Sequence, residues 1–404
     1  MSTVSPPRRA AYEVVRRVFE QDAYADRAFA TAAESLDERD RALAQRIAYG
    51  TVQRARTLDH AIDTLGRRPV RKLDPPVLAA LRIGAYQLAY LDAVPTHAAV
   101  NESVELVRRA RLERAVPFTN AVMRRLAEGI RQLVESLPEG PLALSYPDWI
   151  AEVWERDLGR EQALSLMRAQ NEPPETTVRL LRGSIEGEPT NVPGVFRVSR
   201  VDAAALAEGR IWPQSRGSAL AGLAVGSREG ERTLDVCAAP GGKATQLAGE
   251  VVAVEKHPGR ARELEENVAR LGATNVRVVC ADALELPAGL TGFDRALVDA
   301  PCSGLGVLNQ RPDLRWRAEP LPELQLALLR AAAERVRPGG TIVYSVCTIN
   351  AAENEAVVDA SGLAVDDLGS EWPAFRHPKR PELLLTLPHV HGTSGFFVAR
   401  LRAA

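Results

Sequence analysis

The chain has 404 residues, a formal net charge of −1, 46% hydrophobic residues and 25% charged residues. This length suits two or three domains with separate cores, and the composition is that of an ordinary soluble protein. No uncharged run reaches the roughly 18 residues of a membrane span. The four cysteines form no C-x-x-C pair or Cys/His cluster, which argues against a disulfide framework or a structural metal. The N-terminus has no apolar stretch typical of a signal peptide, so we expect a cytoplasmic protein with reduced thiols.

Charge is divided unevenly along the chain. Residues 1–135 hold 22 Lys and Arg against 17 Asp and Glu, a net of +5, and the remaining 269 residues hold 29 against 35, a net of −6. Such an asymmetry indicates a basic module that binds a polyanion. A solvated helical surface rich in arginine explains the counts equally well, so both interpretations stay open.

Residues 1–135 are expected to form an all-α domain. Apolar residues at helical spacing near 14–19 predict an early helix. The stretch 77–91 is apolar nearly all round, which predicts a buried central helix. Later helices are expected at about 98–111 and from residue 118.

Residues 136–217 are punctuated by proline and glycine, as at Pro173-Pro174 and Pro193-Gly194. Strand-like runs such as 176–180 alternate with turns. We expect a linker and a small α+β subdomain here.

From residue 218 to residue 404 the pattern becomes strand, turn and helix, repeated. This pattern predicts a mostly parallel, doubly wound, Rossmann-like sheet. Pro338-Gly339-Gly340 is typical of a turn before the fifth strand, and 383–387 with 396–401 of a terminal antiparallel hairpin. The expected strands are 233–237, 251–255, 276–281, 295–299 and 341–345, and the expected helices include 260–271 and 321–336.

A glycine-rich loop, Ala239-Pro240-Gly241-Gly242-Lys243, follows the first strand. Ligands of open α/β sheets bind at the carboxyl ends of strands, and glycines let the backbone approach them. The loop has neither the G-x-G-x-x-G pattern of dinucleotide sites nor the pattern of a phosphate-cradling P-loop. Taken alone, such a turn is more often structural.

Acidic residues at the next two strand ends favour a ligand. Glu255 ends the second strand, where a carboxylate accepts both hydroxyls of a ribose, and Asp282 follows the third, in position for an adenine amino group. These positions describe an adenosine site without a pyrophosphate grip, which suits S-adenosylmethionine. A plain surface glutamate is the alternative interpretation of Glu255.

Two cysteines stand at the ends of the fourth and fifth strands. Cys302 follows Asp299-Ala300-Pro301, and Cys347 lies between Ser345 and Thr348. A buried cysteine is usually a small hydrophobe, but two at neighbouring strand ends are improbable by chance. Cys237 and Cys280 are interpreted as structural, with Cys237 close to the cofactor loop.

The pair suits methylation at C5 of cytosine. That carbon is a poor nucleophile until a thiolate adds to C6, and an acid at N3 favours the addition. Asp299 is placed for this acid role. One cysteine would add to C6 and the other would help release the product. The base must leave its stack or arrive single-stranded.

Three motifs resemble the Sun/Nop family of RNA 5-methylcytosine methyltransferases. They are Cys237–Lys243, Asp299–Gly304 with Arg311–Trp316, and Cys347-Thr348 with Glu353–Glu355. The N-terminal helices resemble the antitermination factor NusB at residues 80–88, 98–102 and 118–126.

The fusion is similar to bacterial 16S rRNA cytosine-C5 methyltransferases. It implies a NusB-like RNA-binding domain and a 16S rRNA or early small-subunit assembly intermediate as partner, with no membrane and no metal. It also implies that Cys347 is the nucleophile, Cys302 the release residue and Asp299 the acid. The S-adenosylmethionine contacts that it implies are Cys237, Ala238, Ala239, Pro240, Gly241, Gly242, Lys243, Glu255, Asp282 and Asp299.

Three departures from the family pattern occur, and one of them is that the stretch Gly183–Gly209 is shorter than expected for an RNA-docking helix. Asn309-Gln310 stands where basic residues are common, and Ser215-Arg216 replaces a commonly acidic pair. Two alternatives also stay open. The first is the same chemistry on tRNA or on DNA, where Cys302 would be the attacking cysteine. The second is a non-catalytic rRNA-binding assembly or antitermination factor.

Overall fold

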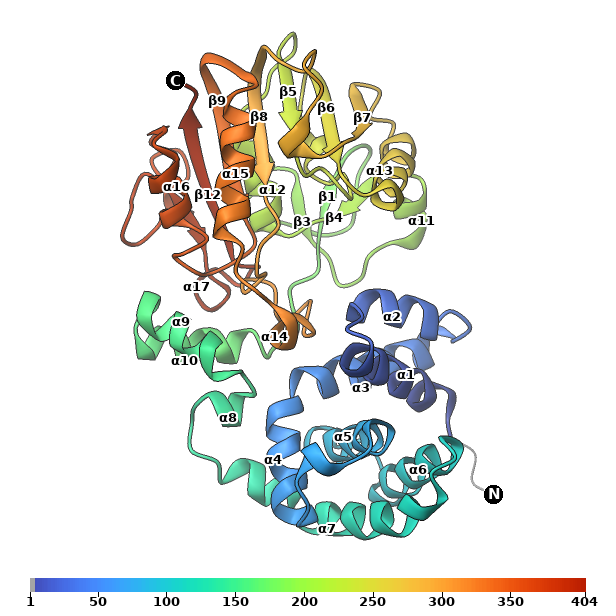
Figure 1. Cartoon of the computed structure of the whole chain (residues 1–404). Coiled ribbons are helices and arrows are strands. Elements are labelled where there is room, and N and C mark those ends of the chain that lie inside the picture. Colours follow the sequence, from blue (N-terminus) through green and yellow to red (C-terminus); the bar gives the residue numbers. More distant parts are fainter. Residues whose placement is uncertain (1–3) are drawn as a thin grey trace. The chain divides into compact units, whose positions relative to one another are not determined.

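The computed structural model describes residues 4–404, and the chain forms two compact units. The helical unit holds the described residues up to Asn171 together with Leu308–Arg317. The sheet unit holds Glu172–Val307 and Ala318–Ala404. Figure 1 shows the helices of the first unit and the sheet of the second. No helix within residues 4–404 is long and apolar enough to cross a membrane.

The helical unit surrounds α5 (Pro75–Tyr90), the expected central helix, which packs against α1, α3, α4, α6 and α7. Leu81, Ile83 and Ala85 on α5 are completely buried, which confirms the prediction from the apolar sequence. The neighbouring helices are α1 (Pro6–Glu20), α2 (Ala25–Ala32), α3 (Glu38–Gln53), α4 (Ala55–Gly66), α6 (Thr96–Arg109) and α7 (Val116–Glu135).

Three more helices follow beyond residue 135. They are α8 (Pro141–Leu144), α9 (Asp148–Leu158) and α10 (Arg160–Ala169), and all belong to the helical unit. Trp154 of α9 and Leu166 of α10 are completely buried. The compact units divide the chain after Asn171, within the range 136–217 for which a linker and a small α+β subdomain were expected.

The segment 308–317 also belongs to the helical unit, although it lies between two strands of the large sheet in sequence. It ends in α14 (Leu314–Arg317), where the Arg315 side chain is completely buried. The Arg315 guanidinium donates to Tyr146 Oη (2.9 Å), to the Gln170 carbonyl (2.9 Å) and to Asn171 Oδ1 (2.8 Å). Burial lowers the pKa of Arg315 to about 10, so it remains charged at neutral pH.

The sheet unit begins with a small antiparallel sheet in the order β2-β3-β1-β4. Its strands are β1 (Thr177–Leu180), β2 (Glu188–Pro189), β3 (Val195–Arg197) and β4 (Ile211–Pro213), and α11 (Ala203–Ala207) precedes β4. This part agrees with the strand-like runs expected before residue 217.

The large sheet has the order β10-β12-β9-β8-β5-β6-β7, and β11 pairs with β12. Strands β5 to β9 are mutually parallel and β12 is antiparallel to β9, so the fold is the expected Rossmann-like, mostly parallel sheet. Helix α15 (Pro322–Ala333) lies in front of β8 and β9 in Figure 1. The strands are β5 (Arg232–Asp235), β6 (Glu250–Glu255), β7 (Val276–Cys280), β8 (Phe293–Asp299), β9 (Val336–Val346), β10 (Ala364–Val365), β11 (Leu384–Thr386) and β12 (Phe396–Arg402), and the other helices are α12 (Arg216–Ala224), α13 (Pro258–Leu271), α16 (Glu355–Ser361) and α17 (Pro388–His391).

One expected turn is part of a strand. Pro338-Gly339-Gly340 lies within β9, which begins at Val336. The pairing of β8 with β9 shifts register between Phe293 and Arg295, and this irregularity accommodates Gly339 in the left-handed region (φ 74°). The terminal antiparallel hairpin of β11 and β12 is confirmed, with α17 in its connection.

Candidate active site

The strands β9, β8, β5, β6 and β7 are neighbours in the large sheet (Figure 1), and the predicted site residues lie at or just after their carboxyl ends in sequence. Along the order β9, β8, β5, β6 and β7, these strands are followed or ended by Cys347, Asp299, the Cys237–Lys243 loop, Glu255 and Asp282. The cysteines therefore lie toward one end of the row and the expected adenosine acceptors toward the other. The loop follows the middle strand of this row, β5.

The two predicted cysteines are in contact. Their sulfur atoms lie 3.4 Å apart, within hydrogen-bonding distance for thiols. The hydrogen bond from Cys302, assisted by the Lys243 charge, holds the pKa of Cys347 below its usual value, although burial opposes this. The same hydrogen bond, together with burial, raises the pKa of Cys302. Cys347 is therefore the better thiolate of the two.

Asp299 is held by two neighbours. Its Oδ2 forms an ion pair with Lys243 Nζ (2.7 Å), and Ser345 Oγ donates to its Oδ1 (2.8 Å). The Lys243 ammonium also lies 5.1 Å from the centre of the Phe396 ring. Lys243 therefore links Asp299 to the cysteine pair. It forms an ion pair with Asp299, and its charge also lowers the pKa of Cys347.

Glu353 fastens both cysteine loops, a role that the sequence analysis did not identify. It is completely buried and accepts hydrogen bonds from the Ser303 amide (2.9 Å), Gln325 Nε2 (2.9 Å) and Asn350 Nδ2 (3.2 Å). The Ser303 hydroxyl bonds both Glu353 and Thr348 Oγ1. Since Ser303 follows Cys302 and Thr348 follows Cys347, this one carboxylate positions both thiols.

The cofactor loop has a backbone that requires glycine. Gly241 has φ 106°, in the left-handed region, and a Cβ on it would lie 2.7 Å from Leu264 Cδ1. A Cβ on Gly242 would lie 2.5 Å from the Trp212 indole nitrogen. Burial, with Asp235 as a further cause, raises the pKa of Cys237 at the start of the loop. Cys237 therefore stays a thiol and packs beneath the loop.

Asp235, the last residue of β5, is a site residue that the sequence analysis missed. It is 1% exposed, and no side chain donates a hydrogen bond to either carboxylate oxygen within residues 4–404. Burial, and then the nearby Asp299 charge, raise the pKa of Asp235 to about 7. A buried carboxylate without a cationic partner is the kind of group that binds a ligand ammonium. Its position two residues before the Cys237–Lys243 loop, at the end of a strand, was the available sequence signal.

The two expected adenosine acceptors differ in their surroundings. Glu255 is 4% exposed, accepts from the His257 amide (2.9 Å) and lies 3.5 Å from Arg260 Nε. Asp282 forms an ion pair with Lys256 (2.7 Å), which holds the pKa of that carboxyl below its usual range. Glu255 is thus the more enclosed acceptor, and Asp282 lies at the solvent side.

These residues fit S-adenosylmethionine. The buried Asp235 carboxylate, which has no side-chain donor within residues 4–404, would suit its ammonium. The glycine loop would allow the ligand to approach the protein backbone closely, and Glu255 and Asp282 would offer acceptors for ribose and adenine. Within residues 4–404 no group of three or more His, Cys, Asp or Glu side chains forms a metal site.

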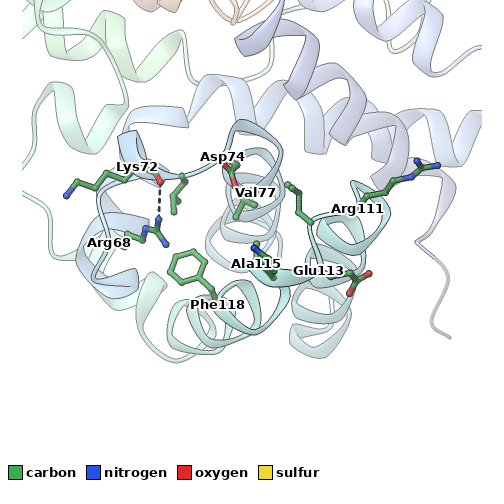
Figure 2. Close-up of a pocket in the computed structure, with 11 residues that line it drawn as sticks. Arg68, Lys72, Asp74, Val77, Arg111, Glu113, Ala115 and Phe118 are labelled. Carbon is green, nitrogen blue, oxygen red and sulfur yellow. Dashed lines mark hydrogen bonds between the residues drawn. The ribbon is translucent and has the colours of Figure 1, made fainter.

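The helical unit contains a basic pocket of about 520 Å³ (Figure 2). Phe118 lies in it, with the Arg68 guanidinium 5.4 Å from the centre of the Phe118 ring. The lining also includes two acidic residues, Asp74 and Glu113. The lining residues are Arg68, Lys72, Leu73, Asp74, Val77, Arg111, Leu112, Glu113, Arg114, Ala115 and Phe118.

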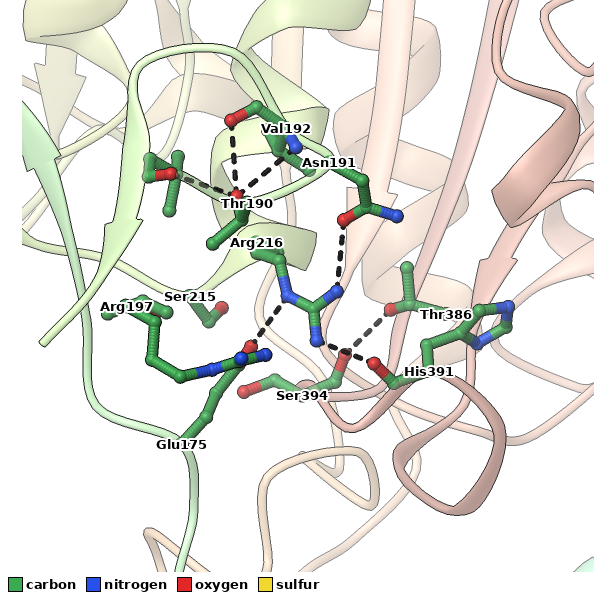
Figure 3. A network of polar contacts seen from close by, with 12 residues as sticks. Glu175, Thr190, Asn191, Val192, Arg197, Ser215, Arg216, Thr386, His391 and Ser394 are labelled. Carbon is green, nitrogen blue, oxygen red and sulfur yellow. Dashed lines mark hydrogen bonds and ion pairs between the residues drawn. The ribbon is translucent and has the colours of Figure 1, made fainter. Parts of the chain in front are cut away.

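The Ser215-Arg216 departure has a structural explanation. Ser215 caps α12 by accepting from the Ser218 amide (3.3 Å), which is a role that an acidic residue also fills. Arg216 is buried and donates to Glu175 (2.9 Å) and Asn191 (3.0 Å), as Figure 3 shows. Both residues therefore have structural roles in the sheet unit: Ser215 caps a helix, and Arg216 joins Glu175 and Asn191 by hydrogen bonds.

Comparison with known proteins identifies both parts of the chain. The family model described as 16S rRNA methyltransferase RsmB/F matches residues 223–402, and the NusB family model matches residues 5–128. The chain is 33% identical to a probable ribosomal RNA small subunit methyltransferase B from Synechocystis, over 98% of this chain and 99% of that protein. It is 35% identical to ribosomal RNA small subunit methyltransferase B from Thermus thermophilus, over 90% and 89%.

Solved structures show the same fold. PH0851 superposes with a TM-score of 0.83 at 23% identity, covering 99% of both chains. NSun6 from Pyrococcus horikoshii, solved with SFG, has a TM-score of 0.54 at 25% identity and covers 64% of this chain and 98% of that one.

Proposed function

The chain belongs to the RsmB/F family of ribosomal RNA methyltransferases and carries a NusB domain, and on this premise we propose that it methylates C5 of a cytosine in 16S rRNA through a covalent cysteine adduct. The observation that carries this proposal is the 3.4 Å contact between Cys302 and Cys347 beside the Lys243–Asp299 pair. Few side chains other than thiolates activate a pyrimidine at C5 by addition to C6.

In the proposed reaction, the Cys347 thiolate adds to C6 of the cytosine. Asp299 hydrogen-bonds N3 and passes it a proton that the Lys243 ammonium, 2.7 Å away, supplies. The addition makes C5 electron-rich, and C5 takes the methyl group. Once Cys347 is bound to C6, the Cys302 thiol loses its proton to water and the resulting thiolate accepts the C5 proton. The Cys347 thiolate leaves as the C5–C6 double bond reforms, and the N3 proton returns through Asp299 to Lys243.

The cofactor in this proposal is S-adenosylmethionine, which supplies an electrophilic methyl group when bound. Asp235 would bind its ammonium, Glu255 its ribose and Asp282 its adenine, with the Cys237–Lys243 loop beneath it. NSun6, a relative of the same fold, was solved with the S-adenosylmethionine analogue SFG, which supports this assignment.

The helical unit is proposed to bind the RNA through its basic pocket. Arg68, Lys72, Arg111 and Arg114 line the same pocket as Phe118, and the Arg68 guanidinium lies against the Phe118 ring (Figure 2). Arginine and lysine bind phosphate groups, and an aromatic ring stacks on an unpaired base. The net charge of +5 over residues 1–135 supports the same role.

A covalent-trapping gel tests the reaction. Wild type, Cys302→Ala and Cys347→Ala are incubated with S-adenosylmethionine and small-subunit rRNA, with Cys280→Ala as a matched control because Cys280 is exposed and lies at the end of β7. We expect Cys302→Ala to accumulate an adduct, Cys347→Ala to form none, and Cys280→Ala to behave as wild type.

The other outcomes separate the alternatives. An adduct in Cys347→Ala but not in Cys302→Ala would reverse the two roles. Methylation of tRNA and not rRNA would show that the substrate is tRNA. S-adenosylmethionine binding without any methylation would favour the non-catalytic rRNA-binding factor.

Salt dependence tests the RNA surface. The logarithm of RNA affinity falls linearly with the logarithm of salt concentration, with a slope set by the number of phosphate contacts. Replacing Arg68 and Lys72 with Gln should reduce that slope by about 1 to 2. An unchanged slope would place the RNA elsewhere.

A further inference from the structure

Arg179 on β1 of the small sheet reaches the cofactor loop of the large sheet, within the same compact unit. The Arg179 residue is 8% exposed. Within residues 4–404 no carboxylate forms an ion pair with its guanidinium. All of its hydrogen bonds go to neutral oxygen atoms. Burying a guanidinium without an ionic partner lowers the stability of the fold, which suggests that Arg179 has a role other than stabilisation.

The guanidinium binds the C-terminal end of the loop and the residue Thr245 that follows it. One terminal nitrogen, Nη2, donates to the Gly242 carbonyl (3.0 Å) and to Thr245 Oγ1 (3.0 Å), and Nη1 lies 3.3 Å from the Thr245 carbonyl. The Thr245 hydroxyl in turn donates to the Gly241 carbonyl (2.7 Å). The loop is therefore tied at Gly241, Gly242 and Thr245 to one side chain.

Two other residues of the small-sheet region support this contact. Gln214 Oε1 accepts from Arg179 Nε (2.8 Å), and Gln214 Nε2 donates to Gln246 Oε1 (3.2 Å). Trp212 of β4 lies so close to Gly242 that a Cβ there would clash with it. Residues of the small sheet and of the segment after it thus pack against one side of the loop.

The contact between Arg179 and the Gly242 carbonyl fixes the orientation of the Gly242–Lys243 peptide. The carbonyl and the N–H of one trans peptide unit point in opposite directions. Because the Gly242 carbonyl points to Arg179, the Lys243 N–H points away from Arg179. An N–H with that orientation is available to an anionic group of a ligand, and the buried positive charge behind the loop strengthens the attraction.

We propose that Arg179 is a positioning residue that orients the Gly242–Lys243 peptide to bind the carboxylate of the methionine moiety of the cofactor. The proposal rests on the proposed use of S-adenosylmethionine. Burial lowers the pKa of Arg179 to about 10, so the side chain keeps its charge at neutral pH. The effect of Arg179 should therefore appear only for ligands that carry the carboxylate.

The test compares two ligands by isothermal titration calorimetry on the full-length chain. S-adenosylhomocysteine carries the amino-acid carboxylate, whereas 5′-methylthioadenosine lacks the amino-acid moiety. Arg179→Met should weaken S-adenosylhomocysteine binding about tenfold or more, as expected when a charge-assisted orientation is lost. The affinity for 5′-methylthioadenosine should stay within about twofold, and Arg179→Lys should recover part of the loss.

Arg216→Met is the matched control. Arg216 is also a buried arginine of the sheet unit, and its hydrogen bonds go to Glu175, Asn191 and the His391 carbonyl rather than to the loop (Figure 3). Its loss should lower stability while both ligand affinities stay at the wild-type level. Equal weakening by Arg216→Met, or equal weakening of both ligands by Arg179→Met, would show a general loosening and overturn the proposal.

The remaining outcomes are also decisive. If Arg179→Met does not fold, Arg179→Lys carries the test alone, and wild-type affinity in that variant refutes the role. Unchanged S-adenosylhomocysteine affinity in Arg179→Met removes the inference but leaves the proposed function. Absence of S-adenosylhomocysteine and S-adenosylmethionine binding in the wild type removes both.

Discussion

The Cys347 sulfur lies 3.4 Å from the Cys302 sulfur, and the hydrogen bond between them lowers the pKa of Cys347 while raising that of Cys302. The proton of the pair is thus held on Cys302. This arrangement keeps a thiolate available at Cys347 for the proposed addition to C6.

Removing Cys302 should make Cys347 less reactive at neutral pH. Without the hydrogen bond that lowers it, the pKa of Cys347 should rise, so the thiolate should form only at higher pH. The alkylation rate of Cys347 by iodoacetamide, followed by mass spectrometry from pH 6 to pH 9.5, should therefore reach its half-maximum at higher pH in Cys302→Ala than in wild type.

Cys280 supplies the internal control for this measurement, since it is exposed and lies outside the pair. Its alkylation profile should be the same in both proteins. A Cys347 profile that stays in place, or that moves to lower pH, would contradict the shared-proton arrangement.

Asp235→Asn should stabilise the protein at pH 8 and weaken its cofactor binding. The pKa of Asp235 is raised from 3.8 to about 7, so between these values the folded protein keeps a proton that the unfolded chain loses. The free energy of unfolding therefore falls as the pH rises through this range. Asparagine removes that loss, which amounts to at most about 4 kcal/mol above pH 7.

Thermal unfolding at pH 3.5 and pH 8 tests the first part, because the two proteins should differ only at the higher pH. Titration with S-adenosylmethionine at pH 8 tests the second, where the variant should bind at least about tenfold more weakly after losing a charged partner for the ammonium. A variant that is less stable at pH 8 and binds normally would contradict both parts.

Glu353→Ala should disable catalysis without touching the cofactor loop. The change leaves the buried donors of Ser303, Gln325 and Asn350 without their acceptor, and each unsatisfied donor costs about 1–3 kcal/mol. We expect a lower unfolding midpoint in urea and loss of the covalent adduct. S-adenosylmethionine affinity, measured by calorimetry on the folded variant, should remain near that of wild type.

Glu353→Gln separates position from charge in this network. The amide keeps one acceptor oxygen but presents a donor toward Asn350 or Ser303, so adduct formation should fall less than in the alanine variant. Full adduct formation in Glu353→Ala would show that the cysteine loops hold their positions without this carboxylate.

Arg315→Met should destabilise the helical unit. The buried guanidinium donates to Tyr146, Gln170 and Asn171, and its loss strands these acceptors, for an expected decrease of about 2–5 kcal/mol in the free energy of unfolding. Urea unfolding followed by intrinsic tryptophan fluorescence, to which the buried Trp154 of the same unit contributes, measures the change. Arg317→Met is a suitable control, because Arg317 is more exposed and bonds Asp22; its loss should change the free energy by no more than about 1 kcal/mol.

Local patterns in the sequence determined much of this protein. The apolar stretch of α5, the alternation of strands and helices after residue 218, and the glycine loop each depend on neighbours along the chain, so periodicity was enough to predict them. Residues such as Glu255 and Asp282 were also predictable as candidates, because the carboxyl ends of parallel strands share one edge of a sheet.

Only the tertiary structure decided which of these groups touch. The pairing of β8 with β9 brings Cys302 and Cys347 together across 45 residues of sequence, and Glu353 accepts hydrogen bonds from Ser303, Gln325 and Asn350. Asp235 became a candidate only when its carboxylate proved buried without a side-chain donor. Arg315 and Arg179 likewise bind segments far away in the sequence, and helical or strand periodicity carries no information about such partners. Burial and charge compensation depend on what the whole fold packs around a side chain, whereas periodicity reports only the next few residues.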